Sequence, residues 1–253
     1  WGENFSRNMI SSEKKLPDSF DIETGRNIKW KVKLGSQTYS TPVIANGKVF
    51  IGTNNDDPRD AKYKGDKGVL YCLNEKDGSL IWQLVVPKIR TSKYWDWPRE
   101  GICSPATVDG DFVYIVSNRG EVMCLDINGL ADGNAGPFKD EAKLLAESGE
   151  PPLKLSKTDA DIIWVYDMID ELNVRQHDGA HSSLLIHGNN IYANTSNGVD
   201  DEHQKIHSPD APSLIVLDKR TGKLVAQDDL KIGDRIFHST WSSPTLGTVN
   251  GKN

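Results

Sequence analysis

Residues 40–52 read Ser-Thr-Pro-Val-Ile-Ala-Asn-Gly-Lys-Val-Phe-Ile-Gly, and this stretch decides the fold. Two runs rich in β-forming residues, 40–44 and 48–52, flank the dipeptide Asn46-Gly47. Asn-Gly between two such runs is the strongest short-range hairpin signal, because both residues accept the positive φ of a tight turn. The stretch therefore predicts an antiparallel hairpin.

The same pattern recurs along the chain. Further β-rich runs begin with Ser-Pro or Ser-Ser pairs, at residues 104–108, 182–186 and 242–246. An apolar third strand is predicted at residues 69–73, 122–126 and 214–218. A Gly-containing turn then leads to a fourth strand. In the middle repeat, a long insertion of about residues 129–161 separates the turn from this strand. Each repeat predicts a four-stranded antiparallel sheet, and we expect the long segment to be a solvated flap with a short helix within 139–147.

Tryptophan marks one position of the repeat. Trp30, Trp82 and Trp164 occupy it, and Ala226 stands there in the last unit. A four-stranded sheet cannot bury both of its faces alone, so repeated sheets pack face to face. A wide, rigid indole fills the gap between two such faces. We expect the three tryptophans to pack between neighbouring sheets and to take no part in chemistry.

Composition excludes several classes of protein. The chain has 253 residues, 37% of them hydrophobic and 26% charged, which is typical of a globular protein and not of a disordered one. Its net charge of −6 argues against nucleic-acid binding through bulk charge. No apolar run approaches the ~20 residues of a membrane-spanning helix. Cys72, Cys103 and Cys124 lie in separate apolar segments without a CxxC motif, and we expect buried free thiols.

The repeat resembles a known family. The turn at residues 218–223, Asp-Lys-Arg-Thr-Gly-Lys, the tryptophan shortly after the turn glycine, and the Ser-Pro strand openings are similar to the pyrroloquinoline-quinone-like (PQQ-like) propeller repeat. Quinoprotein alcohol dehydrogenases and BamB-like lipoproteins carry that repeat. Residues 96–105 and 208–218 look like the PQQ-binding-like propeller proteins of environmental bacteria such as planctomycetes. The resemblance runs from Asn27 onward and implies a fold, but one propeller hosts enzymes, scaffolds and binding modules alike.

The implied fold is all-β. It is a PQQ-like β-propeller of four-stranded antiparallel blades, and we expect this chain to hold about fourteen strands, or three and a half blades of a seven- or eight-bladed ring. A lead-in segment, 1–26, precedes a partial propeller, 27–253, which contains the insertion 129–160. The predicted blades span about 27–78, 79–128, 161–222 and 223–253, the last of them incomplete. We expect the remaining blades to come from sequence after Asn253 or from another chain.

Candidate functional residues lie on the long loops, because propeller sites form at the mouth of the channel. These loops carry aromatic, charged and imidazole side chains of the kinds that hold a ligand or a partner. The candidates are Trp95, Asp96, Trp97, Arg99, His177, Asp178, His181, His238 and Trp241.

The spacing of the histidines predicts no metal site. His177 and His181 have the i, i+4 spacing of metal ligands, but Gly179 between them argues against a helix that would align their rings. His203 and His207 share this spacing in an acidic loop that we expect to be solvated.

Two functions remain open. One is a non-catalytic binding or scaffold protein that recognises a protein, peptide or glycan at the propeller rim. The alternative is a quinoprotein alcohol or sugar dehydrogenase, whose PQQ and Ca²⁺ require an aromatic platform, cations for three carboxylates and a catalytic aspartate. Residue types suited to that site occur at Trp95, Trp97, Arg99, Asp96 and Trp241. The adjacent cysteines of that enzyme family are absent, so we favour the binding protein and assign no cofactor.

The expected location is periplasmic or extracellular. The chain starts at Trp1 and not at Met, as it would after removal of an export signal. We expect neither a nucleic-acid partner nor a transmembrane segment.

Overall fold

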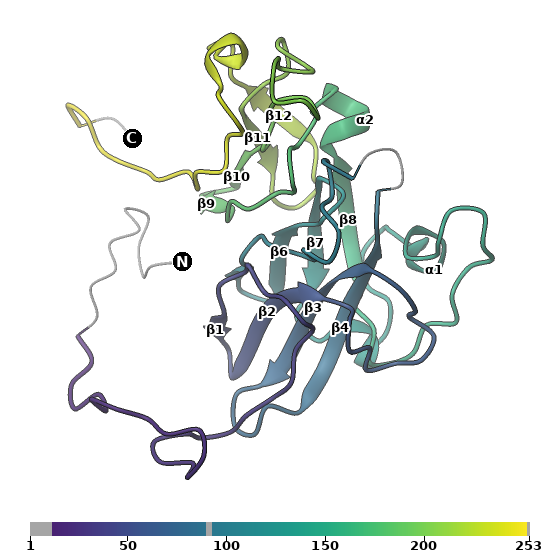
Figure 1. The fold of residues 1–253 in the computed structure, drawn as a ribbon, viewed down its shortest axis with the longest axis vertical. Helices are drawn as coiled ribbons and strands as arrows, with labels where there is room; N and C mark the ends of the chain where they lie inside the picture. Colours follow the sequence, from purple (N-terminus) through teal and green to yellow (C-terminus); the bar gives the residue numbers. More distant parts are fainter. Residues whose placement is uncertain (1–11, 90–92, 252–253) are drawn as a thin grey trace.

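The computed structural model describes residues 12–89 and 93–251, which form three four-stranded antiparallel sheets in succession (Figure 1). The first sheet contains β1 (Val43–Ala45), β2 (Lys48–Asn54), β3 (Lys67–Asn74) and β4 (Leu80–Pro87). The second contains β5 (Thr107–Asp109), β6 (Phe112–Val116), β7 (Glu121–Asp126) and β8 (Ile162–Asp167). The third contains β9 (Leu185–His187), β10 (Asn190–Asn194), β11 (Leu214–Asp218) and β12 (Leu224–Gln227).

Helices are short in this fold. Those in the described part of the chain are α1 (Glu141–Leu144), α2 (Met168–Leu172) and the 3₁₀ turns η1 (Gly129–Ala131) and η2 (Gly233–Arg235). None of the helices in the described ranges has the length and apolarity needed to cross a membrane.

The quoted hairpin forms as predicted. Asn46 and Gly47 have φ of 52° and 72°, and Ala45 pairs with Lys48 across the turn. In the first two sheets, however, the strand that carries the tryptophan is the last strand and not the first, since β4 with Trp82 pairs with β3, and β8 with Trp164 pairs with β7. The sheets therefore span 43–87, 107–167 and 185–227, and the predicted division between residues 78 and 79 falls inside the first of them.

Two predicted strands do not form. The segment around Trp30 and the run 242–246 contain no strand in the part of the chain that is described. A β-strand is defined by a ladder of backbone hydrogen bonds, and neither segment pairs in this way with a strand within residues 12–89 and 93–251. The described residues thus contain the twelve strands named above and not the expected fourteen or so.

Face-to-face packing of the sheets follows from the alternation of side chains along each strand. On β6, Val113 and Ile115 pack with the first sheet, whereas Tyr114 and Val116 pack with the third. The middle sheet is consequently apolar on both faces, and the two seams are the main cores of the molecule.

Each of the three indoles meets the turn that leads into a fourth strand. The indole nitrogens donate to the backbone carbonyls of equivalent turn residues: Trp30 to Glu75 at 2.9 Å, Trp82 to Ile127 at 2.9 Å and Trp164 to Lys219 at 3.1 Å. Each ring also lies against a glycine with positive φ, namely Gly78, Gly129 and Gly222. The three tryptophans thus make equivalent contacts with a turn. Trp82 and Trp164 lie buried between two sheets as predicted, whereas Trp30 is half-buried on the outer face of the first sheet.

The outer faces of the first and third sheets differ. Residues 30–34 cover the first, with Trp30, Val32 and Leu34 against its apolar side chains. On the third sheet Val216 pairs with Ala226, at the register where Cys72 pairs with Trp82. Ala226 is exposed and Val216 is half-buried, so this face is covered less than any other.

The insertion in the second sheet is packed and is not the solvated flap we expected. Its helix α1 lies within the predicted range, but Leu145 is buried in the core between the first and second sheets. Asp159, fully buried, accepts hydrogen bonds from the Tyr63 hydroxyl at 2.8 Å and from Lys62 Nζ at 2.6 Å. These contacts with the β2–β3 loop hold the insertion against the first sheet.

Asp161, also in this insertion, should make stability depend on pH. Its Oδ2 accepts from the Ala135 amide at 2.6 Å, and its buried Oδ1 has no hydrogen-bond partner among the described residues. Burial, and then the charges of Glu141 and Asp126, raise the pKa of Asp161 to about 6. Because this pKa lies above the ordinary value of 3.8, ionisation disfavours the folded state, and stability falls as the pH rises through 6.

We therefore expect Asp161→Asn to raise Tm at pH 7, since an asparagine keeps the Ala135 hydrogen bond without the charge. The gain should shrink toward pH 4, where the wild-type carboxyl is also neutral. Thermal unfolding at several pH values measures this, with the exposed Asp229→Asn as a control. A gain of the same size at every pH would contradict the assigned pKa.

The cysteines confirm the sequence-based expectation, because Cys72, Cys103 and Cys124 are free and buried. Burial raises the pKa of Cys72 and of Cys124 to about 12, so both stay protonated thiols near neutral pH.

Candidate functional site

The long connections lie at one end of the sheets. In an antiparallel four-stranded unit, the β2–β3 loop and the link to the next sheet leave from the same end of the strands, and the hairpin turns lie at the opposite end. The long connections are residues 55–66, 88–106, 173–184 and 195–213, together with the segment after β12. We call this end of the sheets the loop end, and it carries all nine of the predicted rim residues.

An aromatic surface projects from the β4–β5 connection at the loop end. Tyr94 and Trp97 have ring centroids 5.4 Å apart, and Lys93 Nζ lies 4.8 Å and 5.9 Å from the two rings. The Trp97 side chain is 41% exposed. The backbone ties this segment to the next connection, since the Trp97 amide donates to the Asp178 carbonyl at 2.9 Å and the Asp178 amide donates to the Tyr94 carbonyl. We call Lys93, Tyr94 and Trp97 the rim surface.

Asp96 lies beneath the rim surface and anchors it. Its buried carboxylate forms an ion pair with Lys88 and accepts from the Asn118 amide at 2.7 Å and from the Ile89 backbone at 3.0 Å. Burial, opposed by the Lys88 ammonium, raises the pKa of Asp96 to about 6. These contacts, one of them from the β6–β7 turn, bury the carboxylate beneath the loop, so it is not presented to a ligand.

Two other predicted rim residues, Arg99 and Trp95, differ in exposure. The exposed Arg99 guanidinium lies 3.7 Å from Asp56 in the β2–β3 loop. Trp95 meets the His207 ring edge-on at 5.8 Å, and the Arg175 guanidinium lies 4.9 Å from its ring centroid. Trp95 is therefore packed among neighbouring side chains, whereas Trp97 is open.

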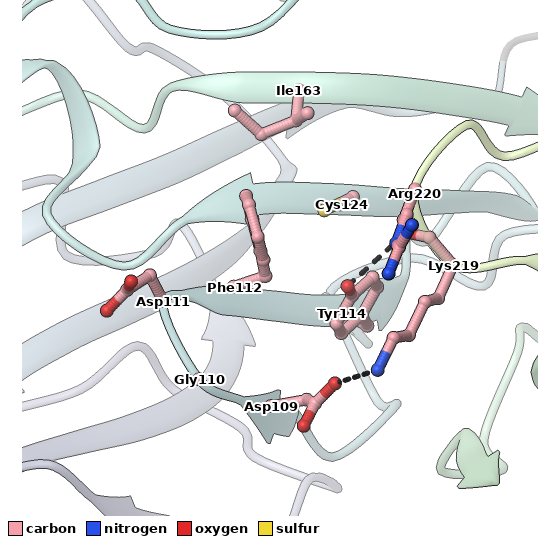
Figure 2. A pocket seen from close by; sticks show the side chains of 9 residues that line it. All are labelled: Asp109, Gly110, Asp111, Phe112, Tyr114, Cys124, Ile163, Lys219 and Arg220. Atoms are coloured by element: carbon pink, nitrogen blue, oxygen red, sulfur yellow. Dashed lines mark hydrogen bonds and ion pairs between the residues drawn. The ribbon is translucent and has the colours of Figure 1, made fainter. Parts of the chain in front are cut away.

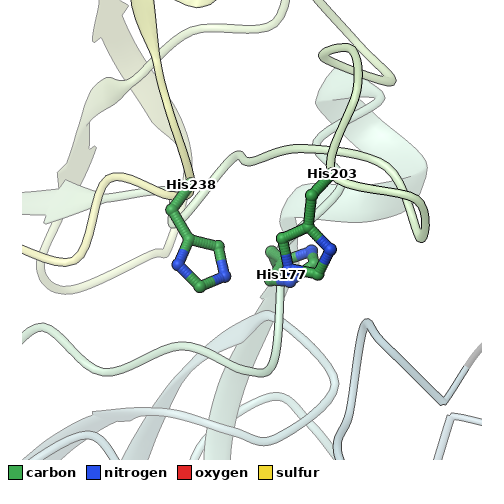
Figure 3. A group of neighbouring side chains, drawn as sticks. All are labelled: His177, His203 and His238. Carbon is green, nitrogen blue, oxygen red and sulfur yellow. The ribbon is translucent and has the colours of Figure 1, made fainter.

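Three histidines from three separate segments converge at the loop end (Figure 3). His177 comes from the α2–β9 connection, His203 from the β10–β11 connection and His238 from the segment after β12. Their ring centroids lie 4.5, 4.6 and 5.0 Å apart. Asp178 adds a carboxylate, with oxygens 3.6 Å from His177 Nε2 and 3.9 Å from His238 Nε2.

A second cluster adjoins the first. His181 Nε2 lies 3.2 Å from a Glu100 carboxylate oxygen. One ligand atom from each of Glu100, Cys103 and His181 lies within 4.8 Å of the other two. The Trp241 ring links the two clusters, with centroids 5.1 Å from His181 and 4.9 Å from His238. The structure thus brings together five predicted residues, namely His177, Asp178, His181, His238 and Trp241.

Other members of the site were missed in the sequence. Tyr94, Glu100 and Cys103 carried no local signal, because their partners are distant in sequence and only the fold brings them together. His203 was noted only for its spacing to His207, in a loop that we expected to be solvated. Sequence spacing suggested His177 with His181 and His203 with His207. The fold instead brings His177 to His203 and to His238.

A pocket of about 330 Å³ lies at the opposite end, between the turns of the second and third sheets (Figure 2). Phe112, Tyr114, Cys124 and Ile163 contribute its apolar wall. Across its mouth Lys219 Nζ forms a 2.6 Å ion pair with Asp109. This pocket could not be predicted from the sequence, since its lining comes from two different sheets.

Comparison with known proteins gives the family. Residues 18–92 and 66–242 match the family described as outer membrane protein assembly factor BamB. The chain belongs to the BamB family. With three antiparallel four-stranded sheets in succession, this match confirms the predicted PQQ-like β-propeller fold.

Solved structures similar to this BamB-family chain are longer than it is. BamB from Moraxella catarrhalis is 16% identical with a TM-score of 0.41, and the match covers 79% of this chain and 39% of that one. Quinohemoprotein alcohol dehydrogenase from Comamonas testosteroni is 11% identical with a TM-score of 0.47, covering 79% of this chain and 22% of that one. No curated protein matches this chain significantly.

Two residues named above for a PQQ site are engaged in other contacts in this BamB-family chain. The Asp96 carboxylate is buried against Lys88 and Asn118, and the Arg175 guanidinium lies over the Trp95 ring. The clusters of possible metal ligands found among the described residues contain histidine or cysteine, whereas Ca²⁺ prefers an all-oxygen set.

Proposed function

We propose that this chain is a non-catalytic binding or scaffold module that holds an extended polypeptide at the loop end of its propeller sheets. The observation that carries the proposal is the rim surface, in which the exposed Trp97 ring lies beside the half-buried Tyr94 ring and Lys93 on a loop fixed from below. Aromatic and cationic side chains are the residues that most often dominate protein interfaces.

Preorganisation of the rim surface supports this function. The buried Asp96 carboxylate holds the loop through three partners, and backbone hydrogen bonds tie the loop to residue 178. A surface ordered before binding loses little entropy when a partner docks, which favours affinity. The rim surface can therefore serve as a recognition site without a cofactor.

The chemistry of the rim surface favours a polypeptide over a glycan. Lys93 at its edge attracts carboxylates, and the adjoining rings accept apolar or aromatic side chains. The proposed partner is a segment that carries both acidic and aromatic residues. The family description refers to assembly of outer membrane proteins, which supports a location outside the cytoplasm for this chain as well.

Peptide selection tests the proposal. A displayed library of random unstructured peptides is selected on the chain, and the affinities of the enriched peptides are measured by fluorescence anisotropy. We expect acidic–aromatic peptides, and we expect Trp97→Ala to weaken their binding by about 30-fold, as for a hot-spot residue. Phe112→Ala is the matched control, because Phe112 is 39% exposed but lies at the opposite end.

Three results would overturn the proposal. The first is equal binding by Trp97→Ala and wild type. The second is selective binding of oligosaccharides in a parallel glycan panel. The third is reduction of a dye with alcohols or sugars after addition of PQQ and Ca²⁺, which would make the chain an enzyme.

A further inference from the structure

We infer that His177, His203 and His238 form a binding site for a divalent transition metal, with Zn²⁺ as the best-matched ion. One ring nitrogen from each histidine lies within 4.8 Å of the other two. Around a tetrahedral zinc with Zn–N distances of 2.0–2.1 Å, ligand nitrogens lie about 3.3 Å apart. Small rotations of the three side chains would therefore close the set around an ion.

The tautomer of His177 suits metal binding. Its Nδ1 lies 3.0 Å from the Val199 carbonyl oxygen. Because a carbonyl oxygen can only accept, Nδ1 carries the proton and Nε2 presents its lone pair toward the cluster. Metal-bound histidines commonly donate their second nitrogen to a carbonyl in this way, which fixes both the tautomer and the ring orientation. His177 is only 1% exposed, so this orientation is held by packing.

His238 contributes an unsatisfied nitrogen. Its Nε2 is buried and has no hydrogen-bond partner among the described residues, and the nearest Asp178 oxygen is 3.9 Å away. A buried polar atom without a partner costs about 1–3 kcal/mol. A metal ion between the three rings would provide the missing partner. The Asp178 carboxylate oxygens lie 3.6 Å from His177 Nε2 and 3.9 Å from His238 Nε2, so a rotation of this side chain would bring one of them to the ion as a fourth ligand.

The backbone brings the three segments together. The Val199 amide donates to the His238 carbonyl at 2.8 Å, and the Gly198 amide donates to the Arg175 carbonyl at 3.0 Å. A Cβ on Gly198 would lie 2.6 Å from the His238 carbonyl oxygen and 2.8 Å from the His177 Cβ, so only glycine permits this approach. The site is thus built by the fold and not by exposed loops that meet by chance.

Imidazole selects among ions. Three neutral imidazoles with one carboxylate suit Zn²⁺ and neighbouring late transition metals, whereas Ca²⁺ and Mg²⁺ prefer oxygen ligands. The ion would link three connections of the third sheet to one another, and through residue 178 to the loop that carries the rim surface. The inference does not depend on the proposed function.

Metal titration of the chelator-treated chain tests the inference. We expect one Zn²⁺ per chain by isothermal titration calorimetry, and a rise in Tm on adding Zn²⁺. We expect His203→Ala and His238→Ala each to weaken binding by about 100-fold or more, and Asp178→Asn by about 10-fold. His203 is exposed, so its replacement should leave the fold intact. Co²⁺ gives an independent readout, since a tetrahedral site produces visible absorption bands that Zn²⁺ abolishes.

His207→Ala is the matched control. His207 is also exposed and lies four residues from His203, but it packs against Trp95 and not in the cluster. We expect this variant to bind Zn²⁺ like the wild type and to keep the rise in Tm. The inference is overturned if the wild type binds no Zn²⁺ or Co²⁺, if His203→Ala binds as tightly as the wild type, or if His207→Ala loses affinity equally.

Discussion

Replacing Trp82 by alanine should lower the free energy of unfolding by about 3–5 kcal/mol, the usual cost of truncating a large buried aromatic side chain. The Trp82 ring is fully buried between the first and second sheets and contacts Phe50 at a centroid distance of 6.0 Å. Its loss would leave a cavity at the seam and deprive the Ile127 carbonyl of its donor. Urea unfolding followed by circular dichroism measures the change.

Two further variants separate the contributions at this seam. Trp82→Phe keeps most of the apolar contact but removes the indole donor, so we expect it to cost less than the alanine variant. Trp97→Ala, a change of the same chemistry at an exposed site, should cost no more than about 1 kcal/mol. A similar loss for Trp82→Ala and Trp97→Ala would contradict the assignment of Trp82 to the sheet interface.

Gly222→Ala is expected to destabilise the chain by about 2–4 kcal/mol, through backbone strain and overpacking together. Gly222 has a φ of +69°, and an added Cβ would lie 2.5 Å from the Trp164 ring. The methyl group would therefore push the indole from the turn that it contacts. Chemical denaturation gives the difference in unfolding free energy from wild type.

Gly47→Ala isolates the backbone part of this effect. Gly47 has nearly the same φ, +72°, but an added Cβ would meet no atom within 4 Å. We expect this variant to lose only the about 1–2 kcal/mol of left-handed strain. If Gly47→Ala and Gly222→Ala were equally destabilised, close contact with the indole would not be the reason for glycine at 222.

The fold could be predicted because its determinants are local and repeated. Asn46-Gly47 specifies a turn within two residues, and the recurring tryptophan marks equivalent strands. The same local evidence misplaced the sheet boundaries, because it cannot show whether the Trp82 strand pairs with the strand before it or the one after it. It also predicted a strand at residues 242–246, which form no β-ladder with the described residues.

The candidate site was predicted only in part. Trp97, His177 and His238, chosen because they lie on long loops, are found at one end of the molecule, and their role in binding stays a prediction. Residue type could not distinguish the open ring of Trp97 from the packed ring of Trp95, since that difference depends on Arg175, 80 residues further along the chain. Nor could the spacing of the histidines identify the cluster, because backbone pairing around Gly198 brings its members together.

Ala226 determines what the outer face of the third sheet can receive. At each of the two interfaces between sheets, an indole of one sheet, Trp82 or Trp164, donates a hydrogen bond to a backbone carbonyl of the next sheet. At the corresponding register the third sheet offers only a methyl group. Any layer that covers this face must supply a bulky side chain of its own to fill the space. The large side chain would then come from the covering layer, whereas at the two interfaces between sheets it comes from the preceding sheet.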